Sequence, residues 1–334
     1  MPWGGRRSEM YPKVRASWLE KGAAIVEYRI LGNTGLKVSK LSFGASSLGG
    51  VFRDIDEAEG IRALHAALDM GMNYIDVSPY YGLTKAEMVL GRALKGIPRD
   101  RYYLATKAGR YGDEVFDFSA RRVVASVDES LERLKLDRID IIQCHDIEFG
   151  NLEEVIHETI PALQTLQEQG KVGFVGVTGL PLRIFTHVIE HARVDTVLSY
   201  CHYSLNDDSL TTIVPSLRSR GVGIIKASPL SMGLLSNRGA PSWHPASDDI
   251  KAACARAAAC CSEHGTDIAK LAIQFSVANP DLATTLVGTA SPENLAKNVR
   301  WIEEPLDLDL LAEVLRILEP IHNRTWPSGR PENN

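Results

Sequence analysis

Short runs of hydrophobic residues alternate with longer amphipathic segments along most of the chain. Two early runs, 28–31 and 36–39, flank the turn residues 32–35, and this spacing predicts a β-hairpin. The later runs are short and apolar, which is typical of strands buried in a parallel sheet. The strands predicted after the hairpin are 40–44, 74–77, 102–107, 138–144, 172–177, 196–200, 222–227 and 284–287.

Each of these strands is followed by a segment that predicts a helix. Asp56 with Glu59, and Thr84 with Glu87, have the spacing of capping boxes, which mark helix starts. The predicted helices are 56–70, 84–94, 119–136, 152–169, 182–191, 209–219, 246–264, 267–278, 292–302 and 307–319. Eight strands that each precede a helix favour a closed parallel barrel over an open, doubly wound sheet.

We therefore predict an α/β fold, a (β/α)8 TIM barrel with an N-terminal β-hairpin and extra helices near the C-terminus. No segment has the composition of a linker, so residues 27–334 are expected to form one barrel domain. Residues 1–26 lack the long apolar core of a secretory signal and carry both basic and acidic residues. We expect them to be a disordered N-terminal extension, with organelle targeting as the alternative.

Composition limits the classes of partner and compartment. The chain has 334 residues, with 37 Lys plus Arg and 42 Asp plus Glu, for a formal net charge of -5. This balance gives no reason to expect nucleic acid or an anionic membrane as a partner. No apolar run reaches the ~18 residues of a transmembrane helix. The five cysteines are scattered and odd in number, which indicates a reducing compartment, the cytoplasm, instead of a disulfide framework.

Four reactive side chains are predicted at one end of the barrel, where the active sites of TIM barrels lie. Asp76, Lys107 and His145 end three consecutive strands, and Tyr81 is in the loop after the first of them. Neighbouring strands are only about 5 Å apart, so these side chains are able to converge. The alternative, purely structural roles are a salt bridge at the barrel mouth for the lysine, a hydrogen-bonding role for the histidine and a turn cap for the aspartate.

Proton transfer explains why these four residue types belong together. A tyrosine with its ordinary pKa near 10 transfers protons poorly at neutral pH. A nearby ammonium lowers that pKa, and a carboxylate holds the ammonium in place. The set predicts Tyr81 as a general acid/base tuned by Lys107 and Asp76, with His145 binding a substrate oxygen. No step requires a metal ion.

These residues and their order resemble the aldo-keto reductases, which are barrel oxidoreductases that use a nicotinamide cofactor. The resemblance extends from Tyr28 to Leu318 and includes Gly71-Met-Asn-Tyr-Ile-Asp76 and Ser228-Pro-Leu-Ser-Met-Gly-Leu-Leu235. It implies that the four residues form a catalytic tetrad. Tyr81 would transfer the proton, Lys107 would tune it, Asp76 would hold Lys107, and His145 would bind the substrate oxygen.

Further segments resemble plant members of that family that oxidise L-galactose at C1 to L-galactono-1,4-lactone in ascorbate biosynthesis. They are His145-Asp-Ile-Glu-Phe-Gly150, Gly176-Val-Thr-Gly-Leu-Pro-Leu182, Leu198-Ser-Tyr-Cys-His-Tyr203 and Trp326-Pro-Ser-Gly329. This resemblance implies L-galactose as substrate, with Phe149 and Trp243 joining Tyr81 and His145 as substrate contacts. The alternatives are another NAD(P)-dependent sugar or aldehyde oxidoreductase, and a regulatory or binding subunit built on the same barrel.

The predicted cofactor pocket departs from the common pattern of the family. Many NADP-dependent members have Lys and Arg after the last strand to bind the 2′-phosphate, where this chain has Gly288 and Asn294. A 2′-phosphate would lack charged donors there, which favours NAD. The usual Ser-Asn pair after the fifth strand is Thr178-Gly179 here. The predicted cofactor-binding residues are Thr178, Tyr200, Ser228, Leu230, Gly233, Gly288, Glu293, Asn294 and Asn298.

Two other motifs do not carry a function in our interpretation. Tyr81 and Lys85 have the Y-x-x-x-K spacing of short-chain dehydrogenases, but that pair needs a helix through both residues and a glycine-rich fingerprint that is missing after the first strand. The pairs Cys144-His145 and Cys201-His202 lack the spacing of zinc ligands. We therefore predict no metal site.

Overall fold

The computed structural model describes residues 26–51 and 55–334. Apart from Val26, the extension predicted at residues 1–26 lies outside this part of the chain, so its disorder stays a prediction. Val26 itself is buried. None of the helices in the described part has both the length and the apolar character that crossing a bilayer demands.

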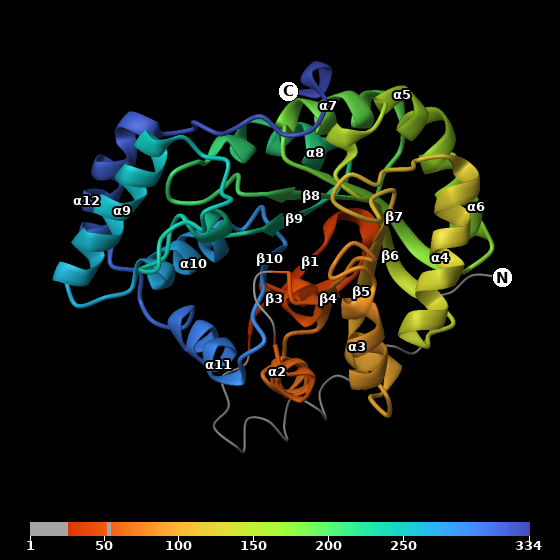
Figure 1. Ribbon diagram of the computed structural model, residues 1–334, viewed down its shortest axis with the longest axis horizontal. Helices are drawn as coiled ribbons and strands as arrows, with labels where there is room; N and C mark the ends of the chain where they lie inside the picture. The colour runs from red at the N-terminus through yellow and green to blue at the C-terminus, as the bar shows by residue number, and fades with distance from the viewer. Residues whose placement is uncertain (1–25, 52–54) are drawn as a thin grey trace.

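Eight parallel strands close into a barrel, which confirms the predicted TIM-barrel fold (Figure 1). Each strand pairs with the next in the chain, and the last pairs with the first. The strands are β3 (Leu41–Gly44), β4 (Tyr74–Asp76), β5 (Tyr103–Ala108), β6 (Ile139–Cys144), β7 (Val172–Gly179), β8 (Thr196–Tyr200), β9 (Gly223–Ala227) and β10 (Thr284–Val287). Because all eight run in parallel, their carboxyl ends open on the same side of the barrel.

The predicted hairpin lies at the other end of the barrel. Strand β1 (Tyr28–Ile30) pairs antiparallel with β2 (Lys37–Ser39). Leu31 and Val38 are fully buried in one cluster with residues from the barrel interior, among them Tyr74, Ala105 and Ile141. The hairpin therefore closes the amino-terminal end of the barrel and leaves the carboxyl-terminal end for a site.

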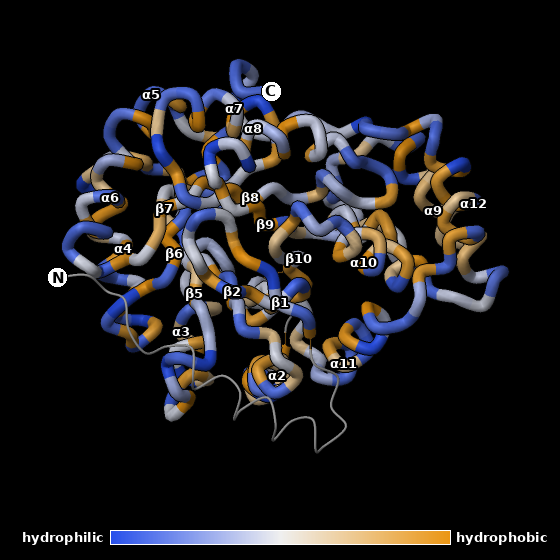
Figure 2. Tube along the Cα trace, turned by 180° about the vertical axis from the view of Figure 1, so that it is seen from behind, coloured by the Kyte–Doolittle hydropathy of each residue, from blue (hydrophilic) through white to orange (hydrophobic). Residues whose placement is uncertain are grey.

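Helices surround the barrel, as the amphipathic segments predict. They are α2 (Glu57–Asp69), α3 (Lys85–Ala93), α4 (Ala120–Leu134), α5 (Leu152–Glu154), α6 (Ile160–Glu168), α7 (Leu182–His191), α8 (Val214–Ser219), α9 (Asp248–Glu263), α10 (Ile268–Ala278), α11 (Pro292–Trp301) and α12 (Leu308–Leu318). Figure 2 shows hydrophobic residues along central strands such as β6 and β8, and hydrophilic residues along the outer loops. Burial of this apolar surface is the main contribution to folding stability.

Two of the predicted helices are less regular than expected. The segment predicted as one helix at 152–169 contains a π-helical turn, Val155–Thr159, between α5 and α6. The segment predicted at 209–219 begins with the 3-10 turn Ser209–Thr212 before α8. Helix periodicity alone does not distinguish these turns from α-helix, because all of them bury the same side of the segment.

The capping box predicted for α3 is wrong, although the helix itself is present. Thr84 is in the left-handed region with φ of 75°, and its side chain makes no capping hydrogen bond. Glu87 is fully buried and accepts hydrogen bonds from Thr106 and from Arg133 Nε at 2.7 Å. The carboxylate of Glu87 therefore joins α3 to β5 and α4, which are partners distant in the sequence. The cap predicted at Asp56 is present, since its side chain accepts the amide of Ala58.

Candidate active site

The structure brings the four predicted residues together at the carboxyl ends of β4, β5 and β6. The Nζ atom of Lys107 donates to Asp76, to the backbone oxygen of Val77 at 3.0 Å and to the Tyr81 hydroxyl at 3.1 Å. Lys107 and Asp76 are both buried. Burial opposes the charge on Lys107, but the carboxylate of Asp76 and the Tyr81 oxygen outweigh it and raise the pKa of Lys107. The ammonium therefore stays protonated beside Tyr81.

A fifth residue holds the carboxylate of Asp76. Gln143 is fully buried in β6, and its Nε2 donates to Asp76 Oδ2 at 2.8 Å, while Lys107 takes the other oxygen. Gln143 was not among the residues predicted from the sequence. The alternation of a strand indicates this residue. Gln143 precedes His145 by two residues, so the two side chains lie on the same face.

The imidazole of His145 is neutral and held in one orientation. Its Nδ1 lies 2.9 Å from Ser78 Oγ, which also accepts the amide of Tyr80 at 3.1 Å. The Ser78 hydroxyl is thus able to donate its own proton to Nδ1, which favours the tautomer with hydrogen on Nε2. Burial lowers the pKa of His145 to about 3, although Asp146 acts in the opposite direction. His145 therefore presents an uncharged N–H donor.

The pKa of Tyr81 moves in the direction opposite to the sequence-based expectation. Burial raises it above its ordinary value, and the charge of Lys107 lowers it by less than burial raises it. The ring of Tyr81 stands perpendicular to that of His145, with the centroids 5.8 Å apart. Lys107 therefore limits the cost of forming tyrosinate but does not bring the pKa below 10.

The turn that presents Tyr81 requires glycine at Gly82. Gly82 has φ of 63°, and a Cβ atom there would lie 2.1 Å from the backbone oxygen of Gly49. The loop after β4 and the loop after β3 are therefore in backbone contact. A side chain at either glycine would push the two loops apart and move the Tyr81 hydroxyl away from Lys107.

Arg110 and three aromatic rings line the side of the site next to His145. The guanidinium of Arg110 lies 3.9 Å from the Tyr80 ring and bonds to Asp146 at 2.6 Å. The ring of Phe149 stacks on Phe116 with centroids 4.6 Å apart, and Arg110 is 5.2 Å from the Phe149 ring. This places the predicted contact Phe149 beside the tetrad. Arg110 was missed, since nothing in its local sequence marks a site.

Trp243, the other predicted substrate contact, lies on the loop between β9 and α9. Its ring stacks on His244, and His244 packs edge-on against Trp326 with centroids 4.7 Å apart. The side chain of Trp243 is 55% exposed, whereas Trp326 is buried. Its contact with substrate stays a prediction.

Two predicted cofactor residues, Thr178 and Tyr200, bind side chains of the loop after β6. Thr178 Oγ1 accepts the amide of Asp146 at 2.9 Å and lies 3.2 Å from Asp146 Oδ1. The Tyr200 hydroxyl donates to Glu148 Oε1 at 3.1 Å. Both residues therefore support the loop that carries His145, and their contact with a cofactor remains a prediction.

Glu148 ties this loop to the C-terminal segment. Its Oε1 accepts from Ser328 Oγ at 3.0 Å and from the amide of Leu180 at 3.1 Å, while its backbone oxygen accepts from Asn333. From α12 the chain runs back across the molecule to end beside α7 (Figure 1). The segment after α12 is thus packed against the loop after β6.

The titration of Glu148 makes a testable prediction about stability. Burial raises the pKa of Glu148 from 4.5 to about 8. Between these values the folded protein binds more protons than the unfolded chain, so the free energy of unfolding falls as pH rises, by up to about 1.4 kcal/mol per pH unit. We expect Glu148→Gln to reduce the loss of Tm between pH 5.5 and pH 8. The exposed Glu332→Gln is the control, and equal losses in both variants would contradict the assignment.

The remaining predicted cofactor residues lie in two segments at the same end of the barrel. Ser228, Leu230 and Gly233 follow β9, in a turn where Ser228 has φ of 56° and Gly233 has φ of 106°. Gly288 follows β10, and a Cβ atom there would lie 3.2 Å from Ser46 Oγ in the loop after β3. Glycine thus leaves the backbone of Gly288 accessible to a ligand.

The first turn of α11 carries a capping serine and an ionised carboxylate. Ser291 caps the helix by accepting the amide of Asn294, and its hydroxyl donates to Glu293 at 2.7 Å. That bond lowers the pKa of Glu293, and the charge of Arg62 lowers it further. The carboxylate is therefore ionised. A carboxylate at a dinucleotide site is suited to accept a ribose hydroxyl. Asn298 lies one turn further along α11. The residues present therefore fit a dinucleotide.

Comparison with known proteins identifies the family. A sequence model described as the aldo/keto reductase family matches residues 40–319. This chain belongs to that family. Aldo-keto reductases use nicotinamide cofactors, which agrees with the fit of the two segments above.

The reductase is also similar to individual sugar dehydrogenases. It is 51% identical over 317 residues to the L-galactose dehydrogenase of Arabidopsis thaliana, covering 92% of this chain and 99% of that protein. It is 32% identical over 274 residues to a D-arabinose 1-dehydrogenase of Saccharomyces cerevisiae, covering 77% and 81%. A solved holo-form aldo-keto reductase from Bacillus halodurans superimposes with a TM-score of 0.73 at 27% identity, over 91% of this chain and 98% of that one. The similarity to the two sugar dehydrogenases supports a sugar dehydrogenase activity.

Proposed function

We propose that this reductase oxidises L-galactose at C1 to L-galactono-1,4-lactone, the step of ascorbate biosynthesis, with NAD as the hydride acceptor. One observation carries the proposal. The Tyr81 hydroxyl, the Lys107 ammonium and a neutral His145 meet at the strand ends of a chain that is 51% identical to an L-galactose dehydrogenase. The same set of side chains suits removal of a proton from a sugar hydroxyl.

In the proposed reaction His145 binds and orients the sugar. The neutral imidazole donates its Nε2 hydrogen to the C1 oxygen, and the aromatic wall of Phe149 and Tyr80 lies beside it. Arg110 already pairs with Asp146, so its charge is satisfied without substrate. Because His145 is uncharged, it does not compete for the proton that leaves the sugar.

Tyr81 takes the proton in this proposal. A dinucleotide held by the segments after β9 and β10 would supply the acceptor for the hydride that leaves C1. Tyr81, as tyrosinate, accepts the proton of the C1 hydroxyl, so the sugar loses one hydride and one proton in total. Lys107 stabilises the tyrosinate charge at 3.1 Å, and Asp76 with Gln143 holds Lys107 in position. Low polarity around the pair strengthens this charge stabilisation.

The choice of NAD over NADP gives the next prediction. Gly288 and Asn294 carry no charge, and Glu293 is ionised beside them, so these three residues offer a 2′-phosphate no charge-assisted bond. We expect kcat/KM with NAD to exceed that with NADP. Asn294→Arg should lower the ratio of kcat/KM with NAD to kcat/KM with NADP by about tenfold or more. This is the change in affinity expected from one charge-assisted hydrogen bond.

The matched control for that change is Asn294→Gln, which lengthens the side chain without adding charge and should leave the ratio unaltered. Both cofactors are compared under one condition by initial rates of dinucleotide reduction. A wild-type preference for NADP would contradict the assignment of Gly288 and Asn294.

Substrate choice is tested by initial rates with L-galactose, D-arabinose, L-fucose and simple alcohols. The proposal expects the highest kcat/KM with L-galactose. A higher value with another sugar would make the protein a different dehydrogenase of the same family. Dinucleotide binding without turnover of any sugar would favour a binding subunit. We also propose a cytoplasmic location, because the five cysteines are all unpaired in the structure.

A further inference from the structure

A cluster of three potential metal ligands lies far from the strand ends, where α9 meets α12. Cys260 and His264 are one helical turn apart at the end of α9, and Glu313 is in the middle of α12. The donor atoms of these three side chains all lie within 4.8 Å of one another. In residues 26–51 and 55–334 they form the one such group of three. The proposed sugar oxidation does not use them.

The hydrogen bonds of His264 orient it as a ligand. Nδ1 lies 2.9 Å from the backbone oxygen of Cys260, and because a carbonyl only accepts, Nδ1 is the donor. In the neutral ring Nε2 then presents its lone pair to the Glu313 carboxylate, 3.6 Å away. Two acceptors facing each other need a proton or a metal cation between them. In many metal sites the ligating histidine binds the metal through one ring nitrogen and donates the hydrogen of the other to a backbone carbonyl.

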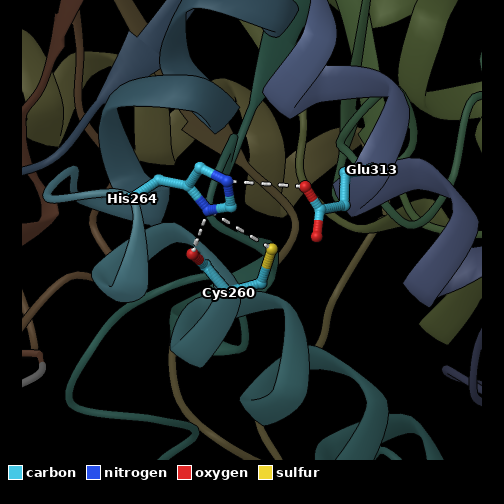
Figure 3. Close-up of side chains that lie close together, drawn as sticks. All are labelled: Cys260, His264 and Glu313. Carbon is cyan, nitrogen blue, oxygen red and sulfur yellow. Dashed lines mark hydrogen bonds and ion pairs between the residues drawn. The ribbon is translucent and has the colours of Figure 1, made fainter.

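The spacing of the donor atoms is close to that of a zinc site. Zinc binds sulfur at about 2.3 Å and nitrogen or oxygen at about 2.0–2.2 Å, so tetrahedral donors are about 3.3–3.6 Å apart. The Nε2 atom of His264 is 3.6 Å from Glu313 Oε2, and one donor atom of each of the three residues lies within 4.8 Å of the other two. Figure 3 shows the three side chains grouped together, with one ring nitrogen of His264 facing Glu313 and the other facing Cys260. Small rotations are enough to bring all three donors onto one ion.

The helices that supply these ligands are already packed together. Cys261 and Ala257 of α9 and Leu310 and Val314 of α12 belong to one buried cluster. Cys260 is buried, whereas His264 and Glu313 are each about half exposed, at 48% and 44%. An ion would therefore have a formed binding site and a path to it from solvent.

We propose that Cys260, His264 and Glu313 bind one Zn²⁺ ion, with water as the fourth ligand, and so join α9 to α12. The thiol of Cys260 releases its proton to solvent as the sulfur binds, and no electron is transferred. Thiolate and imidazole favour zinc over magnesium or calcium, which prefer oxygen ligands. The sequence alone predicts no metal site here, because Glu313 is remote in the chain and only the fold brings it to α9.

The test is zinc titration of the full chain under reducing conditions at pH 7.5, with a chromogenic chelator as competitor. We expect one ion per chain with Kd below about 1 µM. Cys260→Ser and Glu313→Gln should each weaken binding at least about tenfold. Cobalt should show thiolate-to-metal charge-transfer absorption in the wild type and lose it in Cys260→Ser.

The control variant is His187→Gln. His187 is partly exposed and lies 3.1 Å from Glu153, and its ring is tilted against that of His191 one turn away, so it is the natural competing zinc ligand. Retained affinity in this variant supports the proposal. Zinc affinity that is unchanged in Cys260→Ser, or lost in His187→Gln, would overturn it. Sugar oxidation should persist in all of these variants, and this reports that they are folded.

Discussion

Tyr81→Phe lowers kcat for sugar oxidation at least about 100-fold, which is the loss typical when a general acid/base is removed. Phenylalanine keeps the ring and its perpendicular contact with His145 but removes the oxygen that lies 3.1 Å from Lys107. The dissociation constant of NAD should stay within about twofold, because the change removes proton transfer and leaves the dinucleotide segments intact. Stopped-flow rates of NADH formation together with fluorescence titration of NAD separate the two effects.

The control for this loss is Tyr102→Phe. Tyr102 is also buried, but it precedes β5 and so lies at the opposite end of the barrel, where Arg99 covers its ring. Its kcat should remain within about twofold of the wild type. If Tyr81→Phe kept near-normal turnover while binding sugar and NAD, Tyr81 would not be the proton-transfer residue.

Lys107→Met has the second large effect, because it changes both catalysis and stability. Without the ammonium, nothing at 3.1 Å offsets the burial that raises the pKa of Tyr81. The pH profile of kcat/KM, which rises with pH as Tyr81 ionises, should move to higher pH, and the rate at pH 7.5 should fall about 100-fold or more. The same change leaves Asp76 buried without its cation, which costs about 3–5 kcal/mol of unfolding free energy.

Two further variants separate these consequences. The double variant Lys107→Met and Asp76→Asn no longer buries an unpaired carboxylate. It should regain most of the stability lost in Lys107→Met but none of the activity. Lys226→Met is the matched control, since Lys226 is also fully buried but burial lowers its pKa to about 7. That control should keep its pH profile. An unchanged profile in Lys107→Met would show that Lys107 does not tune Tyr81.

The barrel and the tetrad were predictable because both depend on local sequence patterns. The pattern of a strand followed by a helix is repeated eight times along the chain. In a parallel barrel, a residue at the carboxyl end of a strand always lies at the end that holds the active site. Asp76, Lys107 and His145 satisfy that rule, so their convergence followed from their positions. The closure of the other end by Leu31 and Val38 did not follow, because a hairpin's place in the fold depends on distant contacts.

What the sequence did not predict depends on burial and on partners from distant segments. The spacing of Thr84 and Glu87 satisfies a capping box, but the turn after Gly82 places Thr84 in the left-handed region and Glu87 faces Arg133 instead. The direction of the Tyr81 pKa was misjudged because a neighbouring charge can be read from a sequence, whereas the cost of burial cannot. Gln143 and Glu148 take their roles from such contacts as well.

The most direct test of the account follows the hydride itself. L-Galactose carrying deuterium at C1 is incubated with the protein and NAD, and both products are analysed by mass spectrometry. The account predicts one deuterium in each NADH formed, an unlabelled C1 in L-galactono-1,4-lactone, and equal amounts of the two products. Unlabelled NADH, or no reduced dinucleotide at all, would contradict it.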